Sequence, residues 1–498
     1  MSSSTPLAKP RLSASTLAEI PGAVAVPTYD RAAVRPGIVH LGIGAFHRAH
    51  QAVYTDAVLA AGDLRWGIVG ASLRSPDTRD ALVPQDGLYS VASRDESGER
   101  LRIVGSVATV LVAPENPTAL LAALTHPDAA IVSLTVTEKG YCHAPSTGEL
   151  DAAHPDIVHD LAVPERPRSA PGFLIEAIAR RRAVGLAPLT LLSCDNLPDN
   201  GRTLRRVITR LATLRDPDLG HYVADHIRFP STMVDRIVPA TTDADRNAVS
   251  AALGLEDAWP IMTEPFTQWV IEDDFAAGRP AWDEAGATFV SDVAPFELTK
   301  LRLLNGSHST LAYLGWLAGH ETVAEAMRAP GFARLVRALM DEEVTPHLPG
   351  LPGFDLDAYK DSLIARFRNP ALRHRTAQIA MDGSQKLPQR LLHSIRARLE
   401  AGAPFPRLAL GVAAWMRYAR GTDEAGRPID VRDPLADAIR ACTGHLTDAP
   451  AIVEAFLGFE QVFGTDLKAS PTFRAAVETA LARLLRHGAA ATVEAAAA

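Results

Sequence analysis

The sequence predicts an α/β fold followed by a mainly α-helical domain. Three observations support this prediction. Short β-branched runs alternate with helical patterns in the first half of the chain, a glycine-rich turn follows the first run, and strand signals fade after about residue 296. Strands that alternate with helices are typical of a parallel sheet. We therefore expect a Rossmann-like, mostly parallel sheet domain over residues 25–290 and an all-α domain over residues 291–490.

Four apolar runs are the expected strands, at residues 38–41, 66–70, 130–136 and 189–193. The segments between them suit crossover helices, at residues 50–61, 119–124 and 172–183. In the second half, helical periodicity predicts helices over residues 297–317, 331–345, 357–367, 370–381, 386–401, 408–419 and 471–487. Residues 1–20 and the alanine-rich tail after about Gly488 are expected to be loosely held ends, although a terminal alanine run can also extend a helix.

Composition places the chain among ordinary globular proteins. It has 498 residues, 47% of them hydrophobic, and a formal net charge of −8, so nucleic acid and anionic membranes are not expected partners. The N-terminus has no charged or apolar leader, and no 18 uncharged apolar residues follow one another, so we expect neither export nor a membrane span. Three widely separated cysteines favour a reducing compartment, and we expect the cytoplasm.

A glycine turn, Gly42-Ile-Gly44-Ala45-Phe46-His47, joins the first expected strand to a helix. Such a turn lets main-chain N–H groups approach a pyrophosphate at the helix N-terminus. His47 stands where the usual fingerprint has its third glycine, so the motif alone leaves dinucleotide binding and a tight structural turn both open. His47 and His50 also form an H-x-x-H pair, but no third ligand follows at a telling spacing and we expect no metal.

The second expected strand leads into Ala71-Ser72-Leu73-Arg74. NAD enzymes usually place Asp or Glu here to bind the adenosine ribose, and this chain has an acid only later, at Asp77. NAD and NADP therefore both remain open as cofactors. Arg74 is a candidate for a 2′-phosphate or for stacking on adenine, and the alternative is a solvated loop arginine.

Polar residues also follow the later strands of the expected sheet. Ligands of doubly wound sheets bind beyond the carboxyl ends of strands, which makes Glu138, Asp195 and Asn196 candidates. The alternative for Asp195 and Asn196 is that they cap the following loop, while Cys194 is expected to pack as a small hydrophobic residue. Asp235 and Arg236 stand side by side in an apolar run, as a structural ion pair or as substrate contacts.

The motif Lys300-Leu-Arg-Leu-Leu-Asn305-Gly-Ser-His308 lies inside a long apolar segment that is expected to form a buried helix. At roughly 100° per residue, His308 lies about 80° and Asn305 about 140° around the helix axis from Lys300, so all three side chains can point toward one pocket. A lysine, an amide and an imidazole can then meet one substrate oxygen. Lys300 is either a helix-end cation that reaches solvent or a desolvated amine with a lowered pKa suited to proton transfer.

Together, several of these segments resemble the long-chain mannitol dehydrogenase family of polyol-specific, NAD-dependent oxidoreductases. The matching segments are residues 38–52, 133–141, 193–197, 233–237, 268–272 and 300–308, and the pattern Lys-x4-Asn-x2-His is specific to the family. The resemblance covers most of the chain, from about residue 25 to 420. It implies a nicotinamide dinucleotide as cofactor, a small sugar acid or polyol as substrate, and a monomer or weak homodimer.

The resemblance also implies roles for individual residues. Lys300 matches the general acid/base of the family, and Asn196 and Asn305 match the amides that polarise the substrate oxygen. His308 would orient or bind a substrate hydroxyl, Asp235 would accept hydrogen bonds from others, and Lys386 matches a substrate-binding position. Glu297, one turn before Lys300, is either on a proton path to solvent or a carboxylate favoured by the helix dipole.

Within the family, residues 369–390 and 408–418 look most like the fructuronate reductase branch, which reduces fructuronate to mannonate. Mannitol dehydrogenases carry an arginine where this chain has Gln378. A uronate carboxylate requires a cationic partner, best a forked guanidinium, and Arg373 or Arg375 is our candidate for that second cation. Thr267, where relatives commonly have arginine, is a further departure without an assigned effect.

Three other functions remain as alternatives. The first is a mannitol 2-dehydrogenase or another polyol oxidoreductase that applies the same residues to a neutral sugar. The second is a catalytically silent NAD-binding protein, against which the intact Lys-x4-Asn-x2-His motif argues. The third is a decarboxylating hydroxyacid dehydrogenase, since those enzymes also join a nucleotide domain to a helical one.

Overall fold

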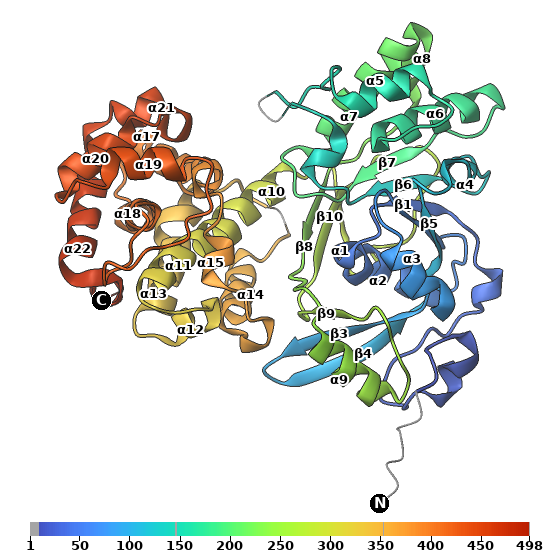
Figure 1. Ribbon diagram of the computed structural model, residues 1–498, viewed down its shortest axis with the longest axis horizontal. Coiled ribbons are helices and arrows are strands. Elements are labelled where there is room, and N and C mark those ends of the chain that lie inside the picture. Colours follow the sequence, from blue (N-terminus) through green and yellow to red (C-terminus); the bar gives the residue numbers. More distant parts are fainter. Residues whose placement is uncertain (1–8, 145–146, 352, 498) are drawn as a thin grey trace, which may run out of the picture. The chain divides into compact units, whose positions relative to one another are not determined.

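The computed structural model describes residues 9–144, 147–351 and 353–497. It separates into two compact units, Met1–Ala294 and Pro295–Ala498. The first unit contains a parallel sheet with helices on its faces, and the second is helical (Figure 1). The predicted fold class, a Rossmann-like parallel sheet followed by a mainly helical part, is therefore confirmed.

The central sheet of the first unit has five parallel strands in the order β5-β2-β1-β6-β7. Their bounds are β1 Ile38–Leu41, β2 Ile68–Ser72, β5 Val107–Val112, β6 Ile131–Leu134 and β7 Thr190–Ser193. Numbered along the chain within this sheet, the order is 3-2-1-4-5, so the direction of winding reverses between β1 and β6. In doubly wound sheets that reversal is where ligands bind, beyond the carboxyl ends of the strands.

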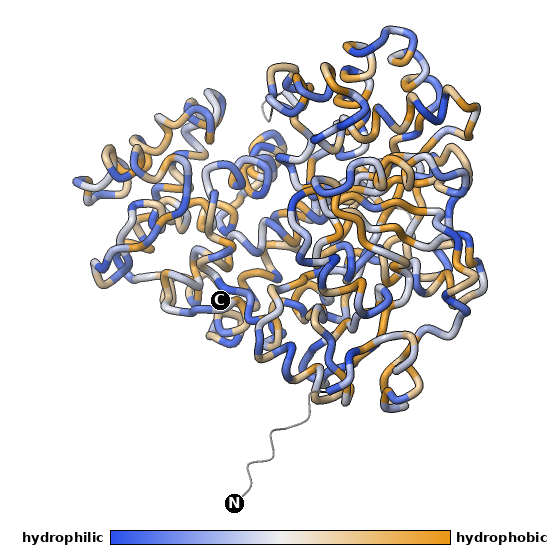
Figure 2. The backbone as a smooth tube through the Cα atoms, turned by 45° about the vertical axis from the view of Figure 1, so that its right-hand side comes forward, coloured by the Kyte–Doolittle hydropathy of each residue, from blue (hydrophilic) through white to orange (hydrophobic). Residues whose placement is uncertain are grey.

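Both faces of this sheet are buried, which explains why its strands are continuous apolar runs. In β1, Val39 and Leu41 belong to the core that includes Leu174 and Val207, from helices of one face. Ile38 of the same strand belongs to the other core, together with Tyr54. Figure 2 shows the hydrophobic segments gathered in the interior of this unit. Successive strand residues thus fill two different cores, as the alternation of side chains along a strand requires.

Two further sheets of three strands complete the first unit. One has the order β4-β3-β9 and the other β11-β10-β8. Their bounds are β3 Tyr89–Asp95, β4 Gly98–Val104, β8 Thr232–Asp235, β9 Ile261–Thr263, β10 Gln268–Glu272 and β11 Thr288–Val290. The sequence did not predict these strands, nor the edge strand β5.

The helices of the first unit include the predicted crossovers. The α-helices are α1 Ala45–Ala49, α2 Gln51–Ala60, α3 Asp77–Leu82, α4 Pro117–Leu124, α5 Pro155–Ala162, α6 Ala170–Ala183, α7 Asn200–Arg215, α8 Pro217–His226 and α9 Asp243–Leu253. Short 3-10 helices are η1 Ala14–Glu19, η2 Arg31–Ala33, η3 Val83–Gln85 and η4 Glu138–Tyr141.

The second unit is built around α18, which packs against α11 and α22. Its α-helices are α10 Ala294–Lys300, α11 Gly306–Leu317, α12 Val323–Arg328, α13 Phe332–Ala338, α14 Leu356–Arg368, α15 Thr376–Ile379, α16 Gly383–Leu387, α17 His393–Glu400, α18 Pro406–Ala419, α19 Ala436–Thr443, α20 Ala449–Leu457, α21 Glu460–Lys468 and α22 Pro471–Ala496. Two 3-10 turns are η7 Thr345–His347 and η8 Pro370–Leu372. No helix in the described ranges combines the length and the apolar character needed to cross a membrane.

Three π-helical segments interrupt the helices of this unit: η5 Leu301–Asn305, η6 Leu339–Val344 and η9 Pro388–Leu392. Both η6 and η9 contact η5. The predicted helix over residues 297–317 is therefore not regular, because i→i+5 hydrogen bonding replaces the i→i+4 pattern between Lys300 and Gly306. The angular offsets expected for a regular helix do not apply across η5, and π segments are frequent at functional sites.

Two other predictions in this unit need correction. The predicted helix over residues 370–381 is wrong, because the segment contains a 3-10 turn, a left-handed residue at Arg373 and only a four-residue helix, α15. Pro370 starts that turn, and the φ of +43° at Arg373 breaks the helical path. Helices α12, α19, α20 and α21 were not predicted. The alanine-rich tail extends α22 beyond a kink at Gly488, with Ala489 and Val493 buried.

The packing around η5 makes a prediction about Gly306. In an ordinary helix, Gly→Ala stabilises by about 1 kcal/mol. At Gly306 a Cβ would lie 2.8 Å from the main-chain oxygen of Arg390, so we expect Gly306→Ala to destabilise the protein by about 1–3 kcal/mol instead. Urea unfolding measures the change. Gly350→Ala is the control, since its new methyl group would have no heavy atom within 4 Å, and an equal effect of both changes would contradict the steric account.

Candidate functional site

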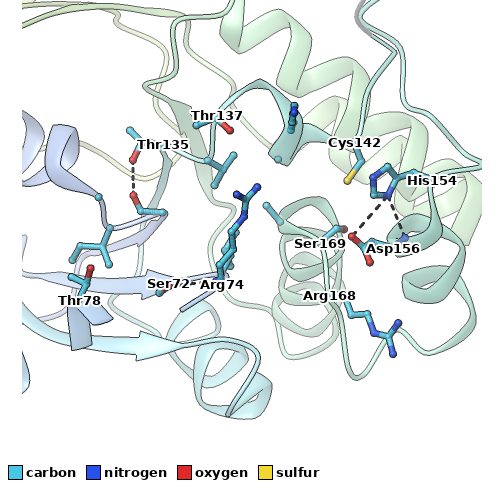
Figure 3. Close-up of a pocket in the computed structure, with 18 residues that line it drawn as sticks. Ser72, Arg74, Thr78, Thr135, Thr137, Cys142, His154, Asp156, Arg168 and Ser169 are labelled. Carbon is cyan, nitrogen blue, oxygen red and sulfur yellow. Dashed lines mark hydrogen bonds and ion pairs between the residues drawn. The ribbon is translucent and has the colours of Figure 1, made fainter. Parts of the chain in front are cut away.

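A cavity of about 580 Å³ opens at the carboxyl ends of the parallel strands of the first unit. It is lined by Gly42 to Gly44 after β1, Ser72 to Arg74 after β2 and Thr135 to Thr137 after β6. Residues at the start of α6, among them Arg168 and Ser169, form another wall (Figure 3). The cavity therefore lies at the point where the winding of the sheet reverses, the usual ligand position in this class of fold.

The two glycines of the turn after β1 differ in their physical constraints. Gly42 has φ +91°, and a Cβ there would overlap the main-chain oxygen of Thr135. A Cβ at Gly44 would meet only the oxygen of Gly42, at 3.7 Å, so protein packing alone does not require glycine at this position. Close approach of a ligand to the main chain does provide a reason for it. This turn has room for a phosphate group at the N-terminus of α1.

His47 occupies the third position of the fingerprint and packs under the sheet. Its imidazole stacks on that of His40, with ring centroids 3.4 Å apart. His40 in turn hydrogen-bonds Ser133 Oγ at 2.8 Å and Thr135 Oγ1 at 2.9 Å. Burial lowers the pKa of His40 to about 3 and also lowers that of His47, so both rings are neutral at pH 7. The stacked pair makes the helix-to-sheet contact that the third glycine provides in the common fingerprint.

Of the predicted cofactor residues, Gly42, Gly44 and Arg74 line the cavity. Ala45, Phe46, His47 and Glu138 do not belong to its lining, among the residues that the structure describes. His47 and His50 also fail to converge as an H-x-x-H pair would around a metal. His50 stacks on Phe46, at 5.0 Å between centroids, and its Nε2 lies 3.0 Å from the main-chain oxygen of Gln268.

Arg74 points into the cavity from the loop after β2 (Figure 3). Its side chain is exposed, and Lys139 and Arg168 are further cations of the lining. The acid in the lining is Asp156, whose carboxylate lies 3.9 Å from His154 Nδ1. The cavity is thus predominantly cationic, which suits the phosphate groups of a dinucleotide.

The two polar residues after β7, Asp195 and Asn196, have different surroundings. Asp195 accepts hydrogen bonds from the main-chain N–H groups of Val136 at 3.1 Å and Thr137 at 2.9 Å, and from Tyr141 Oη at 2.7 Å. It therefore joins the ends of β6 and β7, in agreement with the structural alternative. Asn196 is exposed beyond it. Cys194 is buried in the core, as expected, and burial raises the pKa of its thiol.

Asp235 is buried at the end of β8. The neighbouring Arg236 donates to the main-chain oxygens of Ala49 and Glu264, so its charge serves the packing of the loop rather than a pair with Asp235. Thr267, the departure from the family pattern, hydrogen-bonds Tyr54 Oη at 3.1 Å. The structure thus gives this position a contact inside the first unit.

In the second unit, the π segment η5 separates the residues of the Lys-x4-Asn-x2-His motif. Lys300 ends α10, Asn305 ends η5 and His308 lies in the first turn of α11. Lys300 and Asn305 are half-buried, whereas His308 is buried. Glu297 lies in the first turn of α10, where the helix dipole favours a carboxylate.

His308 lies among aromatic rings and positive charges. Its ring centroid lies 4.6 Å from that of Phe367 and 4.9 Å from that of His374. Burial lowers the pKa of His308 well below 6.5, and His374, Arg366 and Arg390 lower it further. Burial also lowers the pKa of His374, to about 4. His308 is therefore neutral at pH 7 and can both donate and accept a hydrogen bond.

Lys386 and Arg390 belong to the same helical stretch, α16 followed by η9. Lys386 Nζ donates to the main-chain oxygen of Met381 at 2.6 Å, and burial followed by the charge of Arg390 lowers its pKa. Arg390 Nη1 donates to Ser309 Oγ at 3.1 Å. The sequence assigned no individual role to Arg390, Arg366 or His374, although Arg390 and His374 stand in a segment that carries the family resemblance.

The candidate cations Arg373 and Arg375 are placed differently. Both side chains are exposed. Arg375 lines a separate groove together with Asp423, Glu424 and Arg427. The structure therefore does not bring Arg375 to His308, although His374 between the two arginines does contact it. Within residues 9–144, 147–351 and 353–497, no group of three or more His, Cys, Asp or Glu side chains is placed to hold a metal ion.

Comparison with known proteins agrees with both units. The family model of the mannitol dehydrogenase Rossmann domain matches residues 36–284, and that of the mannitol dehydrogenase C-terminal domain matches residues 292–485. Among relatives from Escherichia coli strain K12, the uncharacterized oxidoreductase YeiQ is 49% identical over 472 residues, covering 94% of this chain and 96% of that protein. D-mannonate oxidoreductase of the same strain is 47% identical over 471 residues, with the same coverage.

A solved structure is also similar over nearly the whole chain. It is the mannitol 2-dehydrogenase of Pseudomonas fluorescens, in a ternary complex with NAD and D-mannitol. That protein is 41% identical, covers 97% of this chain and 99% of its own, and superposes with a TM-score of 0.84. The chain described here therefore belongs to the mannitol dehydrogenase family of oxidoreductases.

Proposed function

We propose that this protein catalyses the reversible, NAD-dependent reduction of D-fructuronate to D-mannonate. The observation that carries the proposal is the position of Arg390, whose Nη1 donates to Ser309 Oγ at 3.1 Å, next to the buried His308 in α11. A substrate with a carboxylate is stabilised by such a guanidinium, whereas a neutral polyol gains nothing from its charge. The 47% identity to D-mannonate oxidoreductase supports the same substrate class.

The proposed chemistry assigns the proton to Lys300. A bound nicotinamide dinucleotide supplies the hydride. Lys300 protonates the new alkoxide, and Asn196 and Asn305 donate hydrogen bonds to the substrate oxygen as negative charge develops on it. His308, being neutral, binds a substrate hydroxyl, and Asp235 accepts hydrogen bonds from others. Lys386, already set in place by its bond to the main chain, contributes a positive charge to substrate binding.

We propose NAD as the cofactor, bound in the cavity of the first unit. The unfilled space at Gly44 and the cationic lining fit a dinucleotide, and the solved relative is a complex with NAD. In the absence of an acid after β2, Arg74 offers a partner for a 2′-phosphate, so we expect NADP to be accepted as well.

A mannitol 2-dehydrogenase is the second candidate. The similarity of this chain to the Pseudomonas fluorescens enzyme in complex with D-mannitol favours it. The same Lys300, Asn305 and His308 would then act on a neutral ketose, and the positive charges near His308 would have no substrate partner.

Parallel initial rates distinguish the two candidates. We expect kcat/KM for D-fructuronate to exceed that for D-fructose at least tenfold, because a charge-assisted hydrogen bond contributes about 1.5–3 kcal/mol. Lys300→Met should lower kcat by about 10²–10⁴ with either substrate while leaving NADH affinity unchanged. Lys468→Met is the control, as Lys468 is an exposed residue paired with Glu460. Faster reduction of fructose would refute the uronate assignment.

Gly44→Ala tests the dinucleotide site separately from the chemistry. Because the new methyl group meets no protein atom closer than 3.7 Å, we expect the thermal midpoint to change by less than about 2 °C. The affinity for NADH should nevertheless fall about tenfold or more, since the methyl group would occupy space that the ligand needs. Fluorescence titration measures this. Gly22→Ala, with no neighbour within 4 Å, should leave affinity unchanged; unaltered NADH affinity in Gly44→Ala would contradict the proposed site.

Arg74 sets the expected choice between the two dinucleotides. Arg74→Ala should lower kcat/KM with NADPH about tenfold and that with NADH by less than about threefold, because only the former carries a 2′-phosphate. Arg100→Ala, an exposed residue of β4, is the matched control. Equal losses with both coenzymes would place Arg74 on a part of the dinucleotide that they share.

A further inference from the structure

Arg390 is bound by the fold in a different way from three other arginines of the second unit, Arg398, Arg417 and Arg420. Arg398 donates to the main-chain oxygens of Pro404 and Glu342, and Arg420 to those of Thr443 and Leu446. Arg417 is likewise bound to main-chain oxygens, at Thr422 and Asp423. Each of these guanidinium groups donates two or more hydrogen bonds to main-chain oxygens of the protein. Such bonds satisfy the donors of an arginine that is removed from water.

Arg390 instead donates one hydrogen bond, from Nη1 to the side-chain hydroxyl of Ser309 at 3.1 Å. No carboxylate of the second unit pairs with it in the described part of the chain. Burial lowers its pKa, and the group that opposes this shift is the phenol of Tyr313 rather than an acid. A guanidinium has five N–H donors, so most of those of Arg390 are not used by the fold.

The unused donors of Arg390 keep access to solvent. The Nε atoms of Arg302, Arg407 and Arg420 are buried and have no hydrogen-bond partner. No nitrogen of Arg390 is in that condition. The guanidinium is therefore held at one end by Ser309 and open at the other. A charged group in this state is favourable when an anion completes its hydrogen bonds.

The neighbours of Arg390 belong to the proposed substrate site. Its charge lowers the pKa of both His308 and Lys386, which places it within electrostatic range of each. Ser309, its hydrogen-bond partner, directly follows His308 in α11. The main chain is fixed here too, because the oxygen of Arg390 lies against Gly306. Arg390 thus stands on a rigid support next to two residues that are proposed to bind substrate.

We propose that Arg390 binds the carboxylate of the substrate and determines the preference for a sugar acid over a neutral sugar. This inference rests on the proposed function, and it replaces the exposed Arg375, which lines a groove with Asp423 and Glu424. Ser309 orients the guanidinium, and the remaining donors form a bidentate contact with the two carboxylate oxygens. Lys386 adds a second positive charge to the same carboxylate.

Two variants of Arg390 test the proposal with D-fructuronate and D-fructose as substrates. Arg390→Gln should raise KM for fructuronate about 10- to 100-fold, with kcat/KM for fructose changed by less than about threefold. Arg390→Lys keeps the charge but not the fork and should give a smaller increase of KM, which a purely structural role would not predict. Arg432→Gln, an exposed arginine paired with Asp430, is the control and should change neither substrate.

Equal losses with both substrates in the folded Arg390→Lys variant would overturn the proposal and leave Arg390 as a support for η9. So would an unchanged KM for fructuronate in Arg390→Gln. If Arg390→Gln does not fold, Arg390→Lys decides by the same comparison.

A binding measurement separates this inference from the proposed reaction. With NADH present, D-mannonate should raise the thermal midpoint of the wild-type protein more than D-mannitol does, and Arg390→Lys should reduce that difference. If the wild type shows this effect but does not turn over fructuronate, the proposed reaction fails while the carboxylate site stands. If D-mannonate protects the wild type and Arg390→Lys equally, the site fails even where the reaction is confirmed.

Discussion

Close approach of main-chain atoms at two glycines is the constraint on which both candidate sites depend. In the first unit, Gly42 lies against the oxygen of Thr135, which brings the turn after β1 to the end of β6. In the second unit, Gly306 lies against the oxygen of Arg390, which fixes α11 on the π segment η9. A side chain at either position would separate the elements that carry the functional groups. Each site thus depends on a direct contact between two main-chain segments, the turns after β1 and β6 in the first unit and α11 with η9 in the second.

Buried imidazoles occur in both units, and burial keeps them neutral in each. Burial keeps His40 and His47 neutral beneath the sheet, where their stacked rings fill the place of the missing fingerprint glycine. Burial and nearby positive charges likewise keep His308 neutral. There the proposed consequence is different, because a neutral ring beside a guanidinium can hydrogen-bond a substrate without adding to the repulsion between cations.

The sequence predicted the parts of the fold that depend on local patterns. The runs in β1, β2, β6 and β7 are apolar on both faces and were recognised, whereas β5 was missed, because a hairpin of β3 and β4 interrupts the alternation of strands and helices before it. Hydrophobic periodicity could not show η5 or η9, since π segments change the hydrogen bonding without changing the residue types. It also failed at Arg373, whose left-handed conformation ends the expected helix.

The sequence predicted the type of reaction, but it could not show which residue would bind a substrate carboxylate. The Lys-x4-Asn-x2-His motif is local, and its resemblance to the mannitol dehydrogenase family predicts hydride-transfer chemistry on a carbonyl. The proposed recognition of a carboxylate depends instead on which arginine the fold leaves with unused donors, and that is a property of the folded chain. Arg375 and Arg390 are equally cationic in the sequence, yet Arg375 is exposed and lines a groove with Asp423 and Glu424, while Arg390 is half-buried and donates to Ser309. Arg390 is held by Ser309 at one end and keeps further donors for an anion, which is why we propose it, and not Arg375, as the partner of a substrate carboxylate.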